Sequence, residues 1–77
     1  MSAPLRTYFW DFFGPRSGPT AAHFERHLRG FLAQHGIAEL AVSLEEHSRM
    51  HSAVGLTTPP THYELIESAL RPKRSAP

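Results

Sequence analysis

The sequence predicts a single α+β domain in which two helices cover one face of a three-stranded antiparallel sheet. Three segments place aromatic or apolar residues with a period of two, the period of a strand. Two other segments repeat apolar residues at helical spacing. The chain has 77 residues, the length of one domain. We expect this domain to span residues 1–72 and the basic tail, residues 73–77, to be disordered.

The first strand is predicted at residues 7–14, Thr-Tyr-Phe-Trp-Asp-Phe-Phe-Gly, which hold five of the eight aromatic residues. Side chains alternate along a strand. The two faces therefore consist of Tyr8, Trp10 and Phe12 on one side, and of Phe9, Asp11 and Phe13 on the other. Because burying Asp11 without a partner would be costly, we expect the first set to meet the helices.

The first helix is expected from Pro19 to His35, because proline suits the first position of a helix. Ser17 or Gly18 is the expected cap, and Gly36 supplies a left-handed stop. The apolar stripe of this helix consists of Ala21, Phe24, Leu28, Phe31, Leu32 and His35.

Two alternating strands follow at residues 37–45 and 50–57, and a polar hairpin turn joins them. The second helix opens where Thr61 and Glu64 match a capping box. It ends before Pro72, because the residue that precedes a proline avoids the helical conformation.

This order of elements, β-α-β-β-α, is that of a ferredoxin-like sheet without its fourth strand. Only seven residues follow Leu70, so we expect no fourth strand beside the first one. The outer edge of the first strand is then vacant, and an open edge is a template for pairing with another chain. Pairing of the C-terminal tail with this strand would therefore contradict self-association of the chain.

The sheet face that points away from the helices has few charged residues, which is unusual for a solvated face. It is expected to carry Phe9, Asp11, Phe13, Ala41, Ser43, His51, Ala53 and Gly55. We therefore predict a small non-catalytic module that binds a partner, foremost a second copy of itself, through this face or the vacant edge. Phe9 and Phe13 are the predicted interface residues.

Asp11 and His51 are predicted to lie on that same face, on two neighbouring strands. A carboxylate can orient a histidine and raise its pKa, which is how many general bases are built. The alternative hypothesis is therefore a small dimeric enzyme or ligand-binding protein with this pair in a sheet-face cavity. An ordinary polar pair at an interface would explain the same two residues.

His23 and His27 lie one helical turn apart, a spacing that can chelate a divalent metal ion. Glu25 points away from them, so the zinc-protease motif is excluded. A third ligand would have to come from His47, His62 or a carboxylate. Weak metal binding is therefore the third hypothesis, and we expect no cofactor.

Composition excludes several classes of protein. The chain has no cysteine, which rules out disulfides and thiolate zinc sites and fits a reducing cytoplasm. A net charge of +1 gives no field that would attract nucleic acid, and residues 49–56 lack the aromatic signature of an RNA-recognition strand. No apolar run reaches the length of a membrane span, so we expect neither a membrane partner nor a nucleic-acid partner.

The chain resembles a group of small uncharacterised bacterial proteins that open with the segment Tyr-Phe-Trp-Asp-Phe-Phe-Gly-Pro. Here that segment is residues 8–15, and the resemblance continues in residues 20–28 of the first helix. It implies a small bacterial protein of unknown function and transfers no activity, cofactor or site residue.

Overall fold

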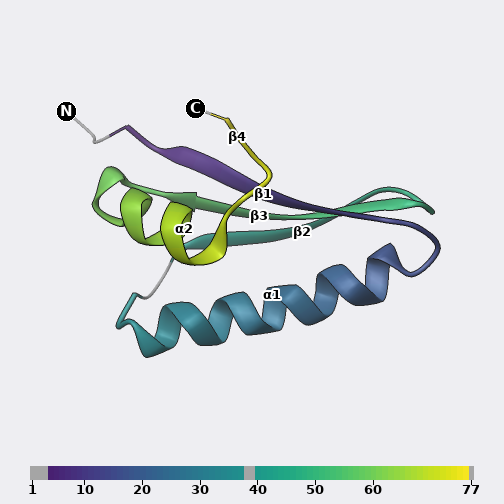
Figure 1. Ribbon diagram of the computed structural model, residues 1–77, viewed down its shortest axis with the longest axis horizontal. Helices are drawn as coiled ribbons and strands as arrows, with labels where there is room; N and C mark the ends of the chain where they lie inside the picture. The colour runs from purple at the N-terminus through teal and green to yellow at the C-terminus, as the bar shows by residue number, and fades with distance from the viewer. Residues whose placement is uncertain (1–3, 38–39, 77) are drawn as a thin grey trace.

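The chain folds into two layers, an antiparallel sheet and two helices that pack on one of its faces (Figure 1). The computed structural model describes residues 4–37 and 40–76. Its elements are β1 (Arg6–Phe13), α1 (Ser17–Gln34), β2 (Ala41–Ser48), β3 (His51–Thr58), the short 3₁₀ helix η1 (Pro60–His62), α2 (Tyr63–Leu70) and β4 (Arg74–Ala76). In these described residues, no helix is long and apolar enough to cross a membrane.

The sheet has four strands in the order β2-β3-β1-β4, and each neighbouring pair is antiparallel. In the register of the central pair, Asp11 lies opposite Ala53 and Phe13 lies opposite His51. On the other side of β3, Glu45 lies opposite Ala53. Because side chains alternate along each strand, this register fixes which of them share a face.

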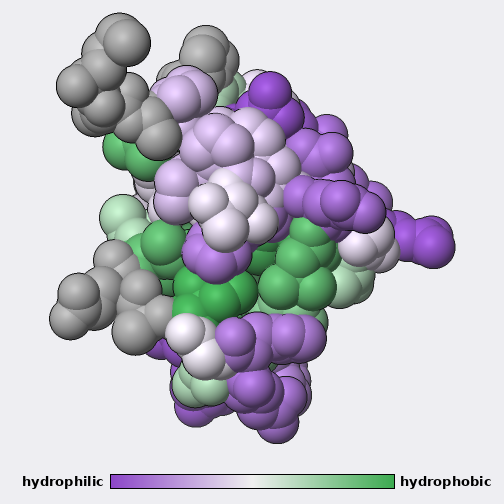
Figure 2. Space-filling view, turned by 90° about the vertical axis from the view of Figure 1, so that its left-hand side faces the viewer, coloured by the Kyte–Doolittle hydropathy of each residue, from purple (hydrophilic) through white to green (hydrophobic). Residues whose placement is uncertain are grey.

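The core lies between the sheet and the helices and uses the face of β1 that the sequence predicts. It consists of Tyr8, Trp10, Ala21, Leu28, Leu32, Ile37, Val54, Leu56 and Ile66. Figure 2 looks at the end of the molecule where α1 finishes and shows apolar residues in a band between the sheet and α1. Trp10 donates a hydrogen bond from Nε1 to the carbonyl of Leu70 at 2.9 Å, which ties the end of α2 to β1. The predicted division of β1 into a core face and an outer face is confirmed.

The fourth strand corrects the sequence prediction, which had three strands and a disordered tail. β4 pairs with β1 through Thr7 and Ala76, Tyr8 and Ser75, and Phe9 and Arg74. After α2, Arg71 takes a left-handed conformation with φ 46°, so the helix ends and the chain turns. The Lys73 amide then donates to the Phe9 carbonyl at 2.9 Å. β4 occupies this edge of β1, and this outcome contradicts the self-association hypothesis in the form predicted from the sequence. Association through the edge is withdrawn, and any contact between two copies has to use the sheet face opposite the helices.

Two of the helix ends agree with the sequence prediction and two differ. α1 begins at Ser17 with Arg16 in the cap position, so the predicted cap residues Ser17 and Gly18 lie inside the helix. Gly36 follows α1 with φ 69°, which confirms the left-handed stop, and α2 ends at Leu70, ahead of Pro72, as predicted. The capping box of Thr61 and Glu64 is wrong. Proline-rich residues ahead of α2 form η1 instead, and the helix begins at Tyr63 after His62.

The β2–β3 hairpin is longer than predicted. β2 continues to Ser48 through residues expected in the turn, and only Arg49 and Met50 form the turn itself. A register irregularity between Glu46 and Ser48 accommodates the extra residue. Of the predicted start of this strand, positions 38 and 39 lie outside the described residues.

Candidate functional site

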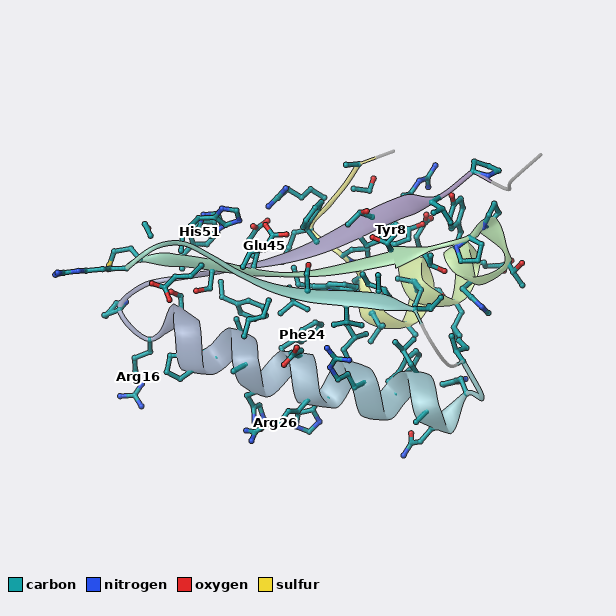
Figure 3. All side chains as sticks on the ribbon, turned by 180° about the vertical axis from the view of Figure 1, so that it is seen from behind. Tyr8, Arg16, Phe24, Arg26, Glu45 and His51 are labelled. Atoms are coloured by element: carbon teal, nitrogen blue, oxygen red, sulfur yellow. The ribbon has the colours of Figure 1, made fainter. Side chains whose placement is uncertain are left out.

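The sheet face opposite the helices, which we call the open face, brings the predicted site residues together. The register places on it Thr7, Phe9, Asp11, Phe13, Ala41, Ser43, Glu45, His51, Ala53, Gly55, Thr57, Arg74 and Ala76. Figure 3 shows Glu45 and His51 on the side of the sheet away from α1, whereas Phe24 lies between α1 and the sheet. Phe9, Asp11, Phe13 and His51 therefore share one face, as predicted.

Asp11 and His51 are in direct contact. Nε2 of His51 lies 2.8 Å from Oδ1 of Asp11. The two residues are diagonal neighbours on adjacent strands, since His51 is paired with Phe13 and Asp11 with Ala53. This contact uses Nε2, one of the two ring nitrogens of His51. The sequence could place the two residues on one face but could not give the register that joins them.

Arg74 of β4 holds the same carboxylate from the other side. Its Nε donates to Oδ2 of Asp11 at 2.8 Å, and its Nη2 donates to Oδ1 at 3.0 Å. This bidentate geometry is the strongest kind of arginine–carboxylate contact. Arg74 was not predicted at this site, because the sequence pattern placed it in a disordered tail. Only the basic character of the tail signalled a possible partner for Asp11.

The charge of Asp11 is set by these partners. Hydrogen bonds from Arg74 lower the pKa of the Asp11 carboxyl to about 2, partial burial opposes the shift, and the hydrogen bond with His51 adds to it. The side chain of Asp11 is only 10% exposed. Asp11 is therefore an anchored anion at ordinary pH, suited to fixing the position of Arg74 and His51.

Phe9 is packed between the sheet and Arg74. A Cβ atom added at Gly55 would lie 3.3 Å from Cε1 of Phe9 and 2.6 Å from Oγ of Ser43, so the ring lies close over the glycine backbone. On its other side, the guanidinium carbon of Arg74 lies 4.2 Å from the ring centroid, a cation–π contact. Phe9 thus has packing partners on β3 and β4 within the chain, and its predicted role at an interface stays a prediction.

Phe13 differs from Phe9 because one side of its ring remains open. The ring stacks on the imidazole of His51 with centroids 4.5 Å apart and planes inclined by 16°. The residue is nevertheless 74% exposed. The pair forms an exposed aromatic surface at one end of the open face.

A second histidine extends this surface toward the edge of the sheet. The ring of His47 lies 4.8 Å from that of His51, and its Nε2 is 3.1 Å from Oε1 of Glu45. The hydroxyl of Ser43 donates to Oε2 of Glu45 at 3.4 Å. Polar and aromatic groups from all four strands are therefore linked across the open face.

His23 and His27 lie far from this network, on the helix layer. Their Nε2 atoms are 3.0 Å apart, and both rings line a groove beside α1. His47, one of the proposed third ligands, contacts His51 on the open face instead. In residues 4–37 and 40–76, no group of three or more His, Cys, Asp or Glu side chains could hold a metal ion.

A further polar cluster, which the sequence analysis missed, joins β1 to α2. The hydroxyl of Tyr8 donates to Oε2 of Glu67 in a short hydrogen bond, and Nη1 of Arg6 donates to the same oxygen at 3.1 Å. The guanidinium of Arg6 also lies 4.5 Å from the centroid of Tyr63. Burial raises the pKa of the Tyr8 hydroxyl, and the hydrogen bond to Glu67 raises it further. These contacts hold α2 against the sheet.

Comparison of the chain with protein-family models, with curated proteins and with solved structures finds no match. The resemblance of residues 8–15 to small bacterial proteins therefore stays a prediction. Functional proposals for this chain rest on the contacts of its own residues.

Proposed function

We propose that this protein is a small non-catalytic binding module that associates with a second copy of itself through the open face. The observation that carries this proposal is Phe13, which is 74% exposed and stacked on His51. The helices pack on the opposite face of the sheet, so they do not cover this ring. A rigid, exposed aromatic ring is typical of the residues that contribute most to binding.

The charges of the open face suit a second copy of the chain. Asp11 and Glu45 are acidic, Arg74 is basic, and His51 and His47 lie beside the two acids. A two-fold axis places a patch against itself, and because Asp11 and Arg74 already compensate each other within the chain, this patch brings little like-charge repulsion to the contact. A chain of 77 residues also builds only a small core, and association is one way in which such domains gain stability.

The fold that we propose for this module is the ferredoxin-like one. The strand order β2-β3-β1-β4 and the two helices on one face support this assignment, because that fold combines the same order of elements with an antiparallel sheet. A cytoplasmic location and a bacterial origin stay predictions from the composition and from residues 8–15.

Replacement of Phe13 by Ser tests the proposed interface. We expect the variant to stay folded, because Phe13 is exposed, and to dimerise about tenfold or more weakly in sedimentation equilibrium. Leu44→Ser is the matched control, since Leu44 is 46% exposed but lies on the helix side of the sheet. Equal dimerisation of Phe13→Ser and wild type, or a strictly monomeric wild type at millimolar concentration, would contradict the proposal.

The contact between Asp11 and His51 favours a second candidate function, in which the pair orients or deprotonates a small ligand. Arg74 argues against strong catalysis, because it already neutralises the carboxylate that would have to support the histidine. An NMR titration of the His51 imidazole in wild type and in Asp11→Asn separates the possibilities. If His51 titrates like a free imidazole and does not respond to Asp11→Asn, the coupling that this function needs is absent.

A further inference from the structure

We propose that His23 and His27 form a chelating site for a divalent transition-metal ion of the copper(II) or nickel(II) class. The two residues lie one turn apart on α1, and both side chains are exposed. Their rings are already in contact, with centroids 4.4 Å apart. This site is independent of the open face, which lies on the opposite side of the sheet.

The distance between the two nitrogens is short enough for one metal ion to bind both, and the order of metal affinities at imidazole sites favours Cu²⁺. The Nε2 atoms are 3.0 Å apart. Two metal–nitrogen bonds of about 2.05 Å span this distance when the nitrogen–metal–nitrogen angle is about 94°. A tetrahedral angle at the metal would place the two nitrogens about 3.3 Å apart. Neighbouring positions of a square-planar or tetragonal ion are about 90° apart, and imidazoles in that arrangement suit Cu²⁺ and Ni²⁺.

The protonation of the rings is compatible with chelation. One imidazole now donates an Nε2–H to the Nε2 of the other. When a metal ion binds both Nε2 atoms, the donor ring carries its proton on Nδ1 instead, through exchange with solvent. Both rings are neutral before and after this change, so the step requires no net release of a proton.

The surroundings of the pair leave room for the remaining ligands. Both histidines line a groove of about 530 Å³ whose apolar wall includes Phe24, Phe31 and Leu70. The described residues supply two ligands, so water or an anion completes the coordination. Arg26 also lines the groove, but its charge is screened by salt at an exposed site.

Calorimetry and electron paramagnetic resonance with Cu²⁺ test the site on the intact chain. We expect one bound ion with two nitrogen ligands. Because loss of one histidine abolishes chelation, His23→Ala and His27→Ala should each weaken binding at least about 100-fold. Alanine favours a helix, so both variants should remain folded. His35→Ala, at the residue that follows α1, and His51→Ala, on the open face, are the matched controls and should bind Cu²⁺ as wild type does.

Three results would overturn the site. The first is unchanged Cu²⁺ affinity in the double variant His23→Ala/His27→Ala. The second is loss of the bound ion in His51→Ala, which would place the copper on the open face. The third is Cu²⁺ affinity within a few-fold of wild type in His23→Ala or His27→Ala, because a single imidazole would then account for the binding.

Discussion

Asp11 is the residue on which the polar contacts of the open face converge. It joins Arg74 of β4 to His51 of β3, and it lies on β1 between them. Both partners contact its Oδ1, while Arg74 alone also contacts Oδ2. A carboxylate held in this way acts chiefly as an anchor, because its charge is already compensated by the arginine.

The lowered pKa of Asp11 predicts a loss of stability in acid. Its folded pKa of about 2 lies below the ordinary value, so its stabilising effect is complete above that ordinary value. The effect is lost as the pH falls toward about 2 and the carboxylate takes up a proton. Because Arg74 is partly exposed, solvent screens this ion pair, and we expect the pair to contribute about 1–2 kcal/mol to the free energy of unfolding. Urea unfolding at pH 7, 4 and 2 measures this contribution. Between pH 7 and pH 2, the free energy of unfolding of wild type should fall by that amount relative to that of Asp11→Asn. A constant difference across this range would contradict the anchoring role.

Gly55 provides a test of the close packing under Phe9. A methyl group there would crowd Ser43 and Phe9, so Gly55→Ala should destabilise the fold by about 1 kcal/mol although alanine is the better strand residue. Gly30→Ala is the matched control, because a Cβ at Gly30 meets nothing within 4 Å and α1 is helical there. That control should gain about 0.5–1 kcal/mol in denaturant unfolding. Stabilisation by both substitutions would show that the Ser43 hydroxyl and the Phe9 ring both move aside freely.

At the scale of elements, β4 is the strand that changes the properties of the sheet. It covers the edge of β1 at three residue pairs and delivers Arg74 to the open face. We predict that residues 74–76 are rigid, with backbone order parameters of roughly 0.8 in ¹⁵N relaxation measurements. Values below about 0.6 would indicate a flexible tail and would leave the edge of β1 open to pairing.

The elements that the sequence could predict are those whose signals are local. The aromatic run of β1 and the stop at Gly36 are confirmed because alternation and a left-handed glycine depend on neighbouring residues only. β4 was missed because its three residues have no strand pattern and depend on contacts with β1. Arg74 was missed for the same reason, and the register that joins Asp11 to His51 follows from the pairing of distant strands.

At the scale of the whole molecule, the two faces of the sheet differ in what they contact. One face is covered by α1 and α2 and holds the core, while the other carries a connected polar network and the exposed ring of Phe13. The arginine contact on Phe9 and the anchored Asp11 order this second face before any partner binds. Such preorganisation lowers the entropic cost of association, which suits a binding surface in a small domain.

Association through the open face is tested most directly by NMR spectra of the intact wild-type chain, recorded at concentrations from about 1 mM down to about 10 µM. We predict that amide shifts of Phe13, Glu45 and His51 move together with concentration and fit a dimer. Amides near His23 and His27 on α1 should stay unchanged. Spectra that are identical at all concentrations, or changes confined to the outer side of α1, would contradict the proposed interface.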